Sequence, residues 1–356
     1  MRDTGDPARV NIALVGAGTI AASYVEGLQA SPGFEVTLVC SSSGASARAL
    51  AAEHGLRASS LDTILRDPEV DYVLNLTPAD EHVPLTRACL EAGKSVYSEK
   101  PLAGSLEEAD ALIALAEQRR LLLACAPATL LWPPLATARE MVVQDRLGAI
   151  VGACTTLVYP GPQLFHPAPG RLFGALAGPL RDMGVYQVTA LLALLGPVKL
   201  VSAFASRARD ERTVMVGPDA GATFPVVAQT HVHAQLIHTT GAISSLMVSF
   251  DGYCARAPVL EVWGQRAGIS LENWYAPDAK LSFSDQLGQR TEIALNGPAW
   301  SPQSLAIGPT SAWAEHHEGK EVTISARRAR DALAVMVAME TSSQSNRTIE
   351  LASRAP

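Results

Sequence analysis

Two glycines near the start of the chain have the spacing that suits a dinucleotide pyrophosphate. Gly16 and Gly18 follow the apolar run 10–15, and Ala21 stands three residues later. Gly16 permits a tight turn, Gly18 lets backbone N–H groups approach a phosphate, and Ala21 is small enough for close helix–strand packing. Because the next helix begins here, its unpaired N–H groups and dipole favour an anion. The expected contacts are Gly16, Gly18, Thr19 and Ile20; the alternative is a glycine turn without a ligand.

The residues after the second expected strand, 35–40, decide between the two nicotinamide dinucleotides. This strand ends about twenty residues beyond the glycines, where a Rossmann unit places its ribose-reading residue. No carboxylate stands there; the chain has Ser41 and Ser42, with Arg48 in the following helix. Hydroxyls and an arginine suit the 2′-phosphate of NADP, whereas a carboxylate would repel it. We therefore expect NADP(H), with NAD(H) possible; alternatively, Arg48 is an ordinary solvated helix residue.

Two further strand ends carry residues that could act on a bound ligand. Thr77 and Pro78 follow the expected strand 70–76, and Glu99 and Lys100 follow the short strand 95–97. Since ligands bind beyond the carboxyl ends of parallel strands, these residues should line the cofactor cleft. An ammonium in a partly dry cleft lowers the pKa of a neighbouring hydroxyl and stabilises an alkoxide, which makes Lys100 a candidate catalyst.

His82 begins the helix after Thr77-Pro78. We place it among the cofactor-binding candidates. A lone histidine at a helix start is nevertheless more often a capping or packing residue.

The composition fits a two-domain globular protein in a reducing compartment. The chain has 356 residues, 48% of them hydrophobic and 18% charged, which is enough for a substantial core. A polar start without a secretory signal and the lack of a long apolar run predict a cytoplasmic protein. The net charge of −7 is spread along the chain, which disfavours nucleic acid. The five cysteines lack zinc or disulfide spacing; they are Cys40, Cys89, Cys125, Cys154 and Cys254.

The expected elements divide the chain into an α/β half and a strand-rich half. Strands and helices alternate up to residue 127, which predicts an N-terminal Rossmann domain over 1–127. The rest of the chain, 128–356, is expected to form an α+β domain with an open, mostly antiparallel sheet. A helix over 135–143 links it to the first domain. The expected strands of the second domain are 151–158, 199–204, 226–238, 242–250, 259–263, 268–271 and 280–283. A helix over 326–342 closes the domain.

Two stretches of the second half are harder to assign. Residues 276–312 contain Pro277, Pro298, Pro302 and Pro309, so we expect a loose surface crossing without long elements. His231 and His233 share one face of a strand, but no carboxylate or cysteine is spaced to complete a metal site with them. We expect no bound metal.

Together these motifs resemble the glucose–fructose oxidoreductase/inositol dehydrogenase/MocA (Gfo/Idh/MocA) family of nicotinamide-dependent dehydrogenases. The similar features are the glycine turn, the Thr77-Pro78 strand end, Glu99-Lys100-Pro101, and Asp182-Met183-Gly184-Val185-Tyr186 before an apolar helix over 187–195. The resemblance implies that Lys100 stands beside the nicotinamide and the reacting hydroxyl. It also implies that Asp182 and Tyr186 begin the helix that faces the nicotinamide.

The family's second signature ends in histidine in many members, and this chain has Tyr186 instead. It shares tyrosine with the glucose–fructose oxidoreductase and dimeric dihydrodiol dehydrogenase branches, in which the tyrosine is the acid/base. Asp182 and Tyr186 are four residues apart and hence on one helix face. A phenol needs a lowered pKa to work near neutrality, and Lys100 could provide it. The alternative for Tyr186 is a core aromatic.

The resemblance implies hydride transfer between nicotinamide and a carbinol or carbonyl carbon of a sugar, polyol or related compound. Tyr186 would exchange the hydroxyl proton, Lys100 would hold the oxygen, and Asp182 would orient the lysine or accept a substrate hydroxyl. His166, in a Pro-rich loop, is a further candidate substrate contact. The family commonly forms homodimers or homotetramers through the second domain's sheet. Two alternatives remain: a dehydrogenase of a non-sugar diol, such as an aromatic dihydrodiol, and a non-catalytic nucleotide-sensing regulator.

Overall fold

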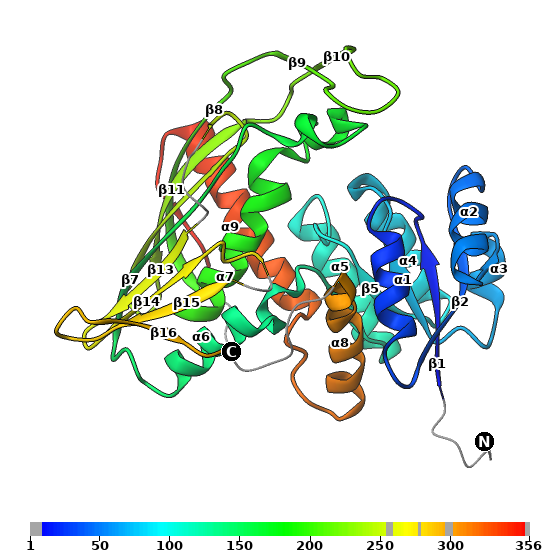
Figure 1. Ribbon diagram of the computed structural model, residues 1–356, viewed down its shortest axis with the longest axis horizontal. Helices are drawn as coiled ribbons and strands as arrows, with labels where there is room; N and C mark the ends of the chain where they lie inside the picture. The colour runs from blue at the N-terminus through cyan, green and yellow to red at the C-terminus, as the bar shows by residue number, and fades with distance from the viewer. Residues whose placement is uncertain (1–8, 254–258, 277–278, 296–301, 353–356) are drawn as a thin grey trace. The chain divides into compact units, whose positions relative to one another are not determined.

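The computed structural model describes residues 9–253, 259–276, 279–295 and 302–352, which form two units (Figure 1). Unit 1 comprises Met1–Leu131 and Trp300–Arg330, and unit 2 comprises Trp132–Ala299 and Asp331–Pro356. The sequence predicts one boundary after residue 127, whereas the chain returns to unit 1 late in the sequence. The reason is apolar packing: Ala306, Ala312 and Ile324 share one buried cluster with Ile12 and Tyr72. The polar start 1–7, Cys254, Pro277 and Pro298 lie outside the described residues.

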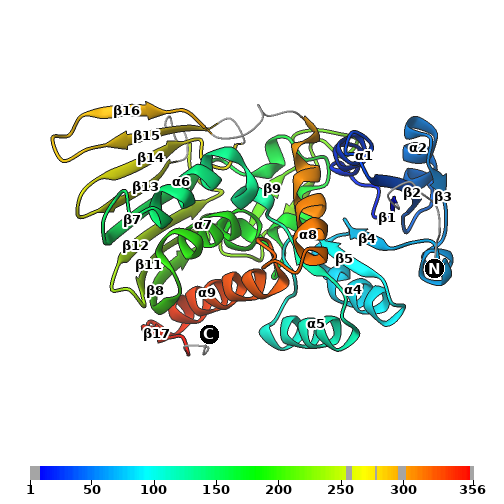
Figure 2. The ribbon, with the colours of Figure 1, turned by 90° about the horizontal axis from the view of Figure 1, so that it is seen from below.

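Unit 1 is built on the expected parallel sheet, in the strand order β3-β2-β1-β4-β5-β6. The strands are β1 (Val10–Val15), β2 (Phe34–Cys40), β3 (Arg57–Ala58), β4 (Tyr72–Asn75), β5 (Ser95–Ser98) and β6 (Leu123–Cys125). The middle strands β1, β4 and β5 are almost wholly buried, because helices cover both faces of the sheet. Helices α4 and α5 lie on one face and α1 on the other (Figure 2).

Six helices of unit 1 lie in the part of the chain that the structure describes. They are α1 (Ala21–Gln29), α2 (Ala45–His54), α3 (Leu61–Arg66), α4 (His82–Glu91), α5 (Leu106–Arg119) and α8 (Ile307–His317). Gly55 ends α2 in the left-handed conformation, as expected of a C-terminal glycine. Ser105 and Glu108 form a capping box at the start of α5.

Helix α8 contradicts the expected loose crossing over 276–312. Eleven residues from Ile307 to His317 are helical although Pro309 lies among them. Pro309 is the third helical residue, where its missing N–H would have no intrahelical partner in any case. The prolines therefore limit where a helix can begin in this stretch, and the sequence-based prediction was wrong for α8.

Unit 2 contains a nine-stranded sheet in the order β16-β15-β14-β13-β7-β12-β11-β8-β17. Its strands are β7 (Ile150–Val158), β8 (Val198–Ser206), β11 (His231–His238), β12 (Ile243–Ser249), β13 (Val259–Gly264), β14 (Gly268–Glu272), β15 (Lys280–Ser284), β16 (Arg290–Ile293) and β17 (Ile349–Glu350). All neighbouring pairs are antiparallel except β7 and β12, which are parallel. The expected open, mostly antiparallel sheet is confirmed.

The helices of unit 2 pack on one face of this sheet (Figure 2). They are α6 (Pro133–Val143), α7 (Val185–Leu195) and α9 (Ala326–Ser345), the last of which begins in unit 1. The strands alternate accordingly: in β11 the residues Val232, Ala234 and Leu236 are buried, whereas His233 and Gln235 are exposed. Among the helices that the structure describes, none is long and apolar enough to cross a membrane.

The chain leaves the sheet between β8 and β11 and forms a short two-stranded ribbon. Its strands are β9 (Glu211–Thr213) and β10 (Thr223–Pro225), which pair antiparallel. Residues 226–230, expected as the start of β11, are not part of this strand, although Thr230 N–H donates to the Ser206 carbonyl of β8 at 2.9 Å. The N–H groups of Val227 and Ala228 both donate to the carbonyl of Phe173, at 2.9 and 3.0 Å.

Candidate active site

The parallel sheet of unit 1 brings the expected cofactor-binding residues to one edge. β1, β2, β4 and β5 run in the same direction, so their carboxyl ends meet there. Backbone hydrogen bonds continue past the strand ends: Gly16 N–H donates to the Cys40 carbonyl at 2.9 Å, and Glu99 N–H to the Asn75 carbonyl at 2.8 Å. The glycine turn, the serines, Thr77-Pro78 and Lys100 therefore belong to one edge, as the sequence predicts.

The two glycines of the turn are required for different reasons. Gly16 has φ of +105°, and a Cβ there would lie 2.5 Å from the carbonyl oxygen of Leu76. A side chain would thus collide with the backbone after β4. At Gly18, a Cβ would meet no described atom within 4 Å. The space beside Gly18 is therefore open to a ligand, and a side chain would fill it.

The start of α1 also fits a dinucleotide. Its N-cap residue, Ile20, makes no side-chain cap, and Ala21 is completely buried against the sheet. Thr19 and Ile20 are exposed, although Ile20 is a large apolar residue. An uncapped helix start after an open glycine is the arrangement that accepts a pyrophosphate.

The segment after β2 places Arg48 over the loop that should meet the ribose. A Cβ on Gly44 would lie 3.1 Å from Nη1 of Arg48, so the guanidinium folds back toward this loop. Ser42 and Arg48 are exposed. The hydroxyl of Ser41 already accepts hydrogen bonds from Ala47 N–H at 3.2 Å and from the Ser46 hydroxyl at 2.9 Å. Ser41 thus supports the start of α2. Its hydroxyl can still donate one hydrogen bond, for example to a phosphate.

His82 makes the contacts of a packing residue, the alternative that the sequence leaves open. It is 1% exposed, and its ring nitrogens lie 2.6 Å from the Pro101 carbonyl oxygen and 2.8 Å from that of Thr77. The ring is thereby committed to holding two loops together. A contact of His82 with a cofactor stays a prediction.

Asn75, at the end of β4, also contacts the Thr77-Pro78 turn and the start of α4. Its buried side chain donates to the His82 carbonyl and the Thr86 hydroxyl, both at 3.1 Å. Its oxygen accepts from the hydroxyl of Thr77 at 2.6 Å and from the N–H of Thr77 at 3.3 Å. The Thr77-Pro78 turn is therefore fixed by a fully used amide.

Glu99 and Lys100 are half-buried at the end of β5. The Glu99 carboxylate accepts hydrogen bonds from the Tyr24 hydroxyl at 2.8 Å and from the N–H of Lys100 at 3.1 Å. The peptide bond between Lys100 and Pro101 is cis. At least one carboxylate oxygen of Glu99 therefore points into the protein interior, toward the buried Tyr24.

In unit 2, Asp182 lies in an unusual helical turn, and Tyr186 lies in the first turn of the helix that follows it. Residues Leu180–Gly184 form a π-helix that continues into α7, so the helix begins seven residues earlier than the expected start at residue 187. Asp182 and Tyr186 are half-buried, whereas their neighbours Arg181, Val185 and Gln187 are buried. The two expected catalytic side chains therefore share the accessible side of this segment. π-turns inside helices occur frequently at functional sites.

Two buried contacts fix this turn within unit 2. Arg181, 5% exposed, binds the Glu340 carboxylate of α9 with two hydrogen bonds of 2.7 and 2.8 Å. The Gln187 amide donates to the Thr155 hydroxyl at 3.2 Å and to the Met247 carbonyl at 3.1 Å. Asp182 is thus carried on a segment that is tied to α9 on one side and to the sheet on the other.

The Pro-rich loop over 159–177 contains His166, the expected substrate contact. The Nδ1 atom of His166 accepts a hydrogen bond of 3.0 Å from Ala168 N–H, so the ring caps a turn. Phe165 is 65% exposed and stacks on Tyr159, with ring centroids 6.3 Å apart. A substrate contact by His166 would have to use its other ring nitrogen.

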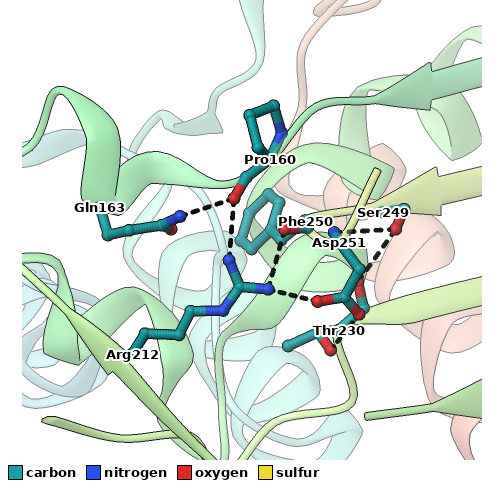
Figure 3. Close-up of polar contacts among 7 residues, drawn as sticks. All are labelled: Pro160, Gln163, Arg212, Thr230, Ser249, Phe250 and Asp251. Atoms are coloured by element: carbon teal, nitrogen blue, oxygen red, sulfur yellow. Dashed lines mark hydrogen bonds and ion pairs between the residues drawn. The ribbon is translucent and has the colours of Figure 1, made fainter. Parts of the chain in front are cut away.

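A buried arginine ties this loop to the ribbon and the sheet (Figure 3). Arg212 of β9 donates to the carbonyls of Pro160 and Phe250, at 2.8 and 2.9 Å, and pairs with the Asp251 carboxylate. Its guanidinium also lies 4.9 Å from the ring centroid of Phe173. Asp251 in turn accepts from the Thr230 hydroxyl at 2.5 Å. One cation therefore joins three segments that are distant in sequence: its own strand β9, the loop over 159–177 and residues 250–251 after β12.

The cysteines at the described positions are free thiols. Cys40, Cys89 and Cys125 are buried, and burial raises the pKa of Cys40 to about 11 and that of Cys89 to about 12. These thiols stay protonated and pack as small apolar side chains.

Comparison with known proteins decides the family. Residues 10–126 match the family model described as "Oxidoreductase family, NAD-binding Rossmann fold", and residues 135–270 match the GFO/IDH/MocA C-terminal domain. The chain belongs to the GFO/IDH/MocA oxidoreductase family. The resemblance inferred from the sequence motifs is confirmed.

Curated relatives within the GFO/IDH/MocA family are matched over part of their lengths. The chain is 30% identical to an uncharacterized protein of Saccharomyces cerevisiae over 157 residues, which cover 42% of this chain and 43% of that protein. It is 29% identical to the 1,5-anhydro-D-fructose reductase of Ensifer adhaerens over 233 residues, which cover 61% of this chain and 67% of the reductase. The chain thus spans less than half of the first of these relatives and two thirds of the second.

Solved structures extend the likeness in fold to nearly the whole chain. Levoglucosan dehydrogenase in complex with NADH and L-sorbose superposes with a TM-score of 0.84 over 96% of this chain and 98% of that protein. The two sequences are 19% identical. This likeness shows that the two proteins share one fold.

Three residues of this GFO/IDH/MocA chain whose contacts hold the site or the loop near it were not identified from the sequence: Asn75, Tyr24 and Arg212. Asn75 is a polar residue inside an apolar strand, which is a signal that sequence reasoning could have used. Tyr24 and Arg212 carry no comparable signal, because their partners Glu99 and Asp251 are 75 and 39 residues away.

Proposed function

We propose that the chain is an NADP(H)-dependent oxidoreductase that transfers hydride between nicotinamide and a carbinol or carbonyl carbon of a sugar, polyol or related compound. The observation that carries this proposal is the common edge in unit 1. An open glycine turn follows β1 and Lys100 follows β5, two parallel strands on either side of β4, and ligands of such sheets bind beyond these strand ends.

Residues of unit 1 would hold the cofactor. Gly16, Gly18 and the start of α1 would bind the pyrophosphate, and Ser42 with Arg48 would bind the 2′-phosphate. The exposed Ile20 offers apolar contact beside the turn. The fit is supported by the open space at Gly18, which a Cβ would fill. NADPH, when bound, supplies the hydride.

The proposed chemistry of the protein's own side chains is proton transfer and charge stabilisation. Tyr186 exchanges a proton with the substrate hydroxyl through its phenolic oxygen. Lys100 stabilises the negative charge that develops on the substrate oxygen. Asp182 accepts a second hydroxyl of the substrate. Asp182 on the π-turn and Tyr186 in the first turn of α7 are both half-buried between buried neighbours, which supports their joint assignment.

The proposed substrate class is taken from the names of similar proteins. The reductase of Ensifer adhaerens is named for 1,5-anhydro-D-fructose, and the levoglucosan dehydrogenase structure contains L-sorbose. Sugars present several adjacent hydroxyls, which suit a site with both donors and acceptors. We extend that class to this chain.

Cofactor titration followed by turnover tests the proposal. We expect NADPH to bind at least about tenfold more tightly than NADH, because Arg48 and Ser42 contact the 2′-phosphate. Arg48→Ala should abolish this preference, whereas Arg66→Ala, an exposed arginine of α3, should leave it unchanged. The measurement is quenching of protein fluorescence by each dinucleotide. Preference for NADH would contradict the assignment of Arg48, and binding without turnover of any sugar or polyol would favour the sensor alternative.

The open face of the unit 2 sheet supports a homo-oligomer. Phe204, Ile243 and Trp263 project on this face and are 70, 52 and 40% exposed. We propose that a second copy covers them, so that the protein is a homodimer or homotetramer. Phe204→Glu with Ile243→Glu should then yield a monomer in sedimentation velocity, whereas Leu287→Glu, in the exposed turn after β15, should keep the assembly. A wild-type monomer would contradict this proposal.

A further inference from the structure

We propose that Tyr24 is a positioning residue for Lys100, acting through the carboxylate of Glu99. This inference rests on the proposed function, in which Lys100 stabilises the reacting oxygen. Tyr24 lies on α1, one turn after the glycine turn, and Glu99 directly precedes Lys100. The side chain of Tyr24 thereby links the pyrophosphate-binding helix to the segment that carries the catalytic lysine.

The contacts divide the Glu99 carboxylate between two donors. The Tyr24 hydroxyl donates to Oε1 at 2.8 Å, and the Lys100 backbone N–H donates to Oε2 at 3.1 Å. With both oxygens engaged, rotation of the carboxylate would break one of the two bonds. The hydrogen bond from Tyr24 therefore also holds the backbone of Lys100.

Tyr24 is suited to be a permanent donor. It is 1% exposed, and its hydroxyl lies 3.2 Å from that of Tyr97 on β5. Burial, followed by the nearby Glu99 charge, raises the pKa of Tyr24 well above its ordinary value. The phenol stays protonated over the whole working range of pH, so the hydrogen bond to Glu99 persists.

The other side of Lys100 is fixed as well. The Pro101 carbonyl lies 2.6 Å from the His82 ring, and Glu99 N–H donates to the Asn75 carbonyl at 2.8 Å. Residues 99 and 101 are thus both tied to the sheet edge. The hydrogen bond from Tyr24 to Glu99 connects this segment to α1, the helix proposed to bind the pyrophosphate.

Tyr24→Phe tests this role, because it removes the hydroxyl and leaves the ring. We expect kcat to fall about tenfold, the size of one hydrogen bond to a charged group, while the dissociation constant for NADPH changes less than about threefold. The matched control is Tyr72→Phe: Tyr72 is completely buried in the same sheet, and its hydroxyl donates to the Pro309 carbonyl at 3.4 Å. This control should keep the wild-type kcat, even if both variants lose similar thermal stability.

A double-mutant cycle with Glu99→Gln separates positioning from general damage. In the amide, an NH2 group replaces one of the two carboxylate oxygens, and it cannot accept from the donor that this oxygen serves, Tyr24 or Lys100 N–H. We expect Glu99→Gln alone to lower kcat about tenfold, and Tyr24→Phe with Glu99→Gln to lose little more than the worse single variant. Such coupling indicates one shared interaction.

Two results would overturn the inference: a wild-type kcat for Tyr24→Phe, or losses in the double variant that multiply to about a hundredfold, as independent sites would give. Both are read against an active wild type. If the wild type binds no dinucleotide or turns over no substrate, the proposed function fails first, and this failure is distinguishable because it precedes any variant.

Discussion

Lys100→Met should lower kcat by about three to four orders of magnitude, since it removes both charge stabilisation and the group that assists proton transfer. The methionine side chain has similar length, and Glu99 still accepts from the backbone N–H of residue 100. We therefore expect the variant to fold, with a melting temperature close to that of the wild type. Steady-state kinetics and single-turnover hydride transfer, monitored by nicotinamide absorbance, measure the loss.

Lys94→Met is the matched control, because it exchanges the same residue types six positions earlier. Lys94 is 6% exposed, and its ammonium donates to the carbonyls of Asp67 and Val70. Its loss leaves two buried carbonyls without their donor and should lower stability while the folded enzyme keeps its kcat. Near-normal turnover by Lys100→Met would remove Lys100 from the mechanism.

Arg212→Met should lower the free energy of unfolding by about 3–5 kcal/mol, the usual cost of breaking a buried ion pair. The guanidinium side chain is 2% exposed and that of Asp251 15%, so the substitution leaves a carboxylate in a poorly solvated place. It also removes the donors to the Pro160 and Phe250 carbonyls. Denaturant unfolding followed by circular dichroism gives the change.

Arg290→Met provides the comparison for this prediction. Arg290 pairs with Glu272 at 3.3 Å, but both side chains are more than half exposed, so the loss should be below about 1 kcal/mol. Arg212→Met with Asp251→Asn should recover part of the stability, because the buried charge is then gone. If Arg212→Met costs no more than Arg290→Met, the buried arginine does not hold the loop as the contacts indicate.

The order of strands and helices in unit 1 could be predicted because local patterns are strong there. The apolar run 10–15, the glycines at its end and the glycine after each of α2 and α4 mark elements by residue type alone. The same holds for the family motifs at Lys100 and Tyr186. The strand content of unit 2 was also predictable from alternation, as β11 and β12 show.

Two features of the structure could not be predicted, for one common reason. They are the partners of the buried His82 ring and the helix within 276–312, a stretch that was expected to be loose. In the first case the deciding partner is the carbonyl of Pro101, 19 residues away; in the second it is a buried cluster that contains Ile12 and Tyr72. Long-range partners of this kind leave no trace in a local window of sequence.

The sequence by itself determined the residue types that chemistry needs and the local elements that carry them: a glycine turn, a lysine after a strand, and an acid and a phenol four residues apart. Only the tertiary structure decided how these groups are held. Gly16 is required because the backbone after β4 passes close to it, and Glu99 faces inward because Tyr24 on α1 donates to it. The physical reason is that hydrogen bonds and close packing depend on separation in space, whereas sequence patterns report only neighbours along the chain.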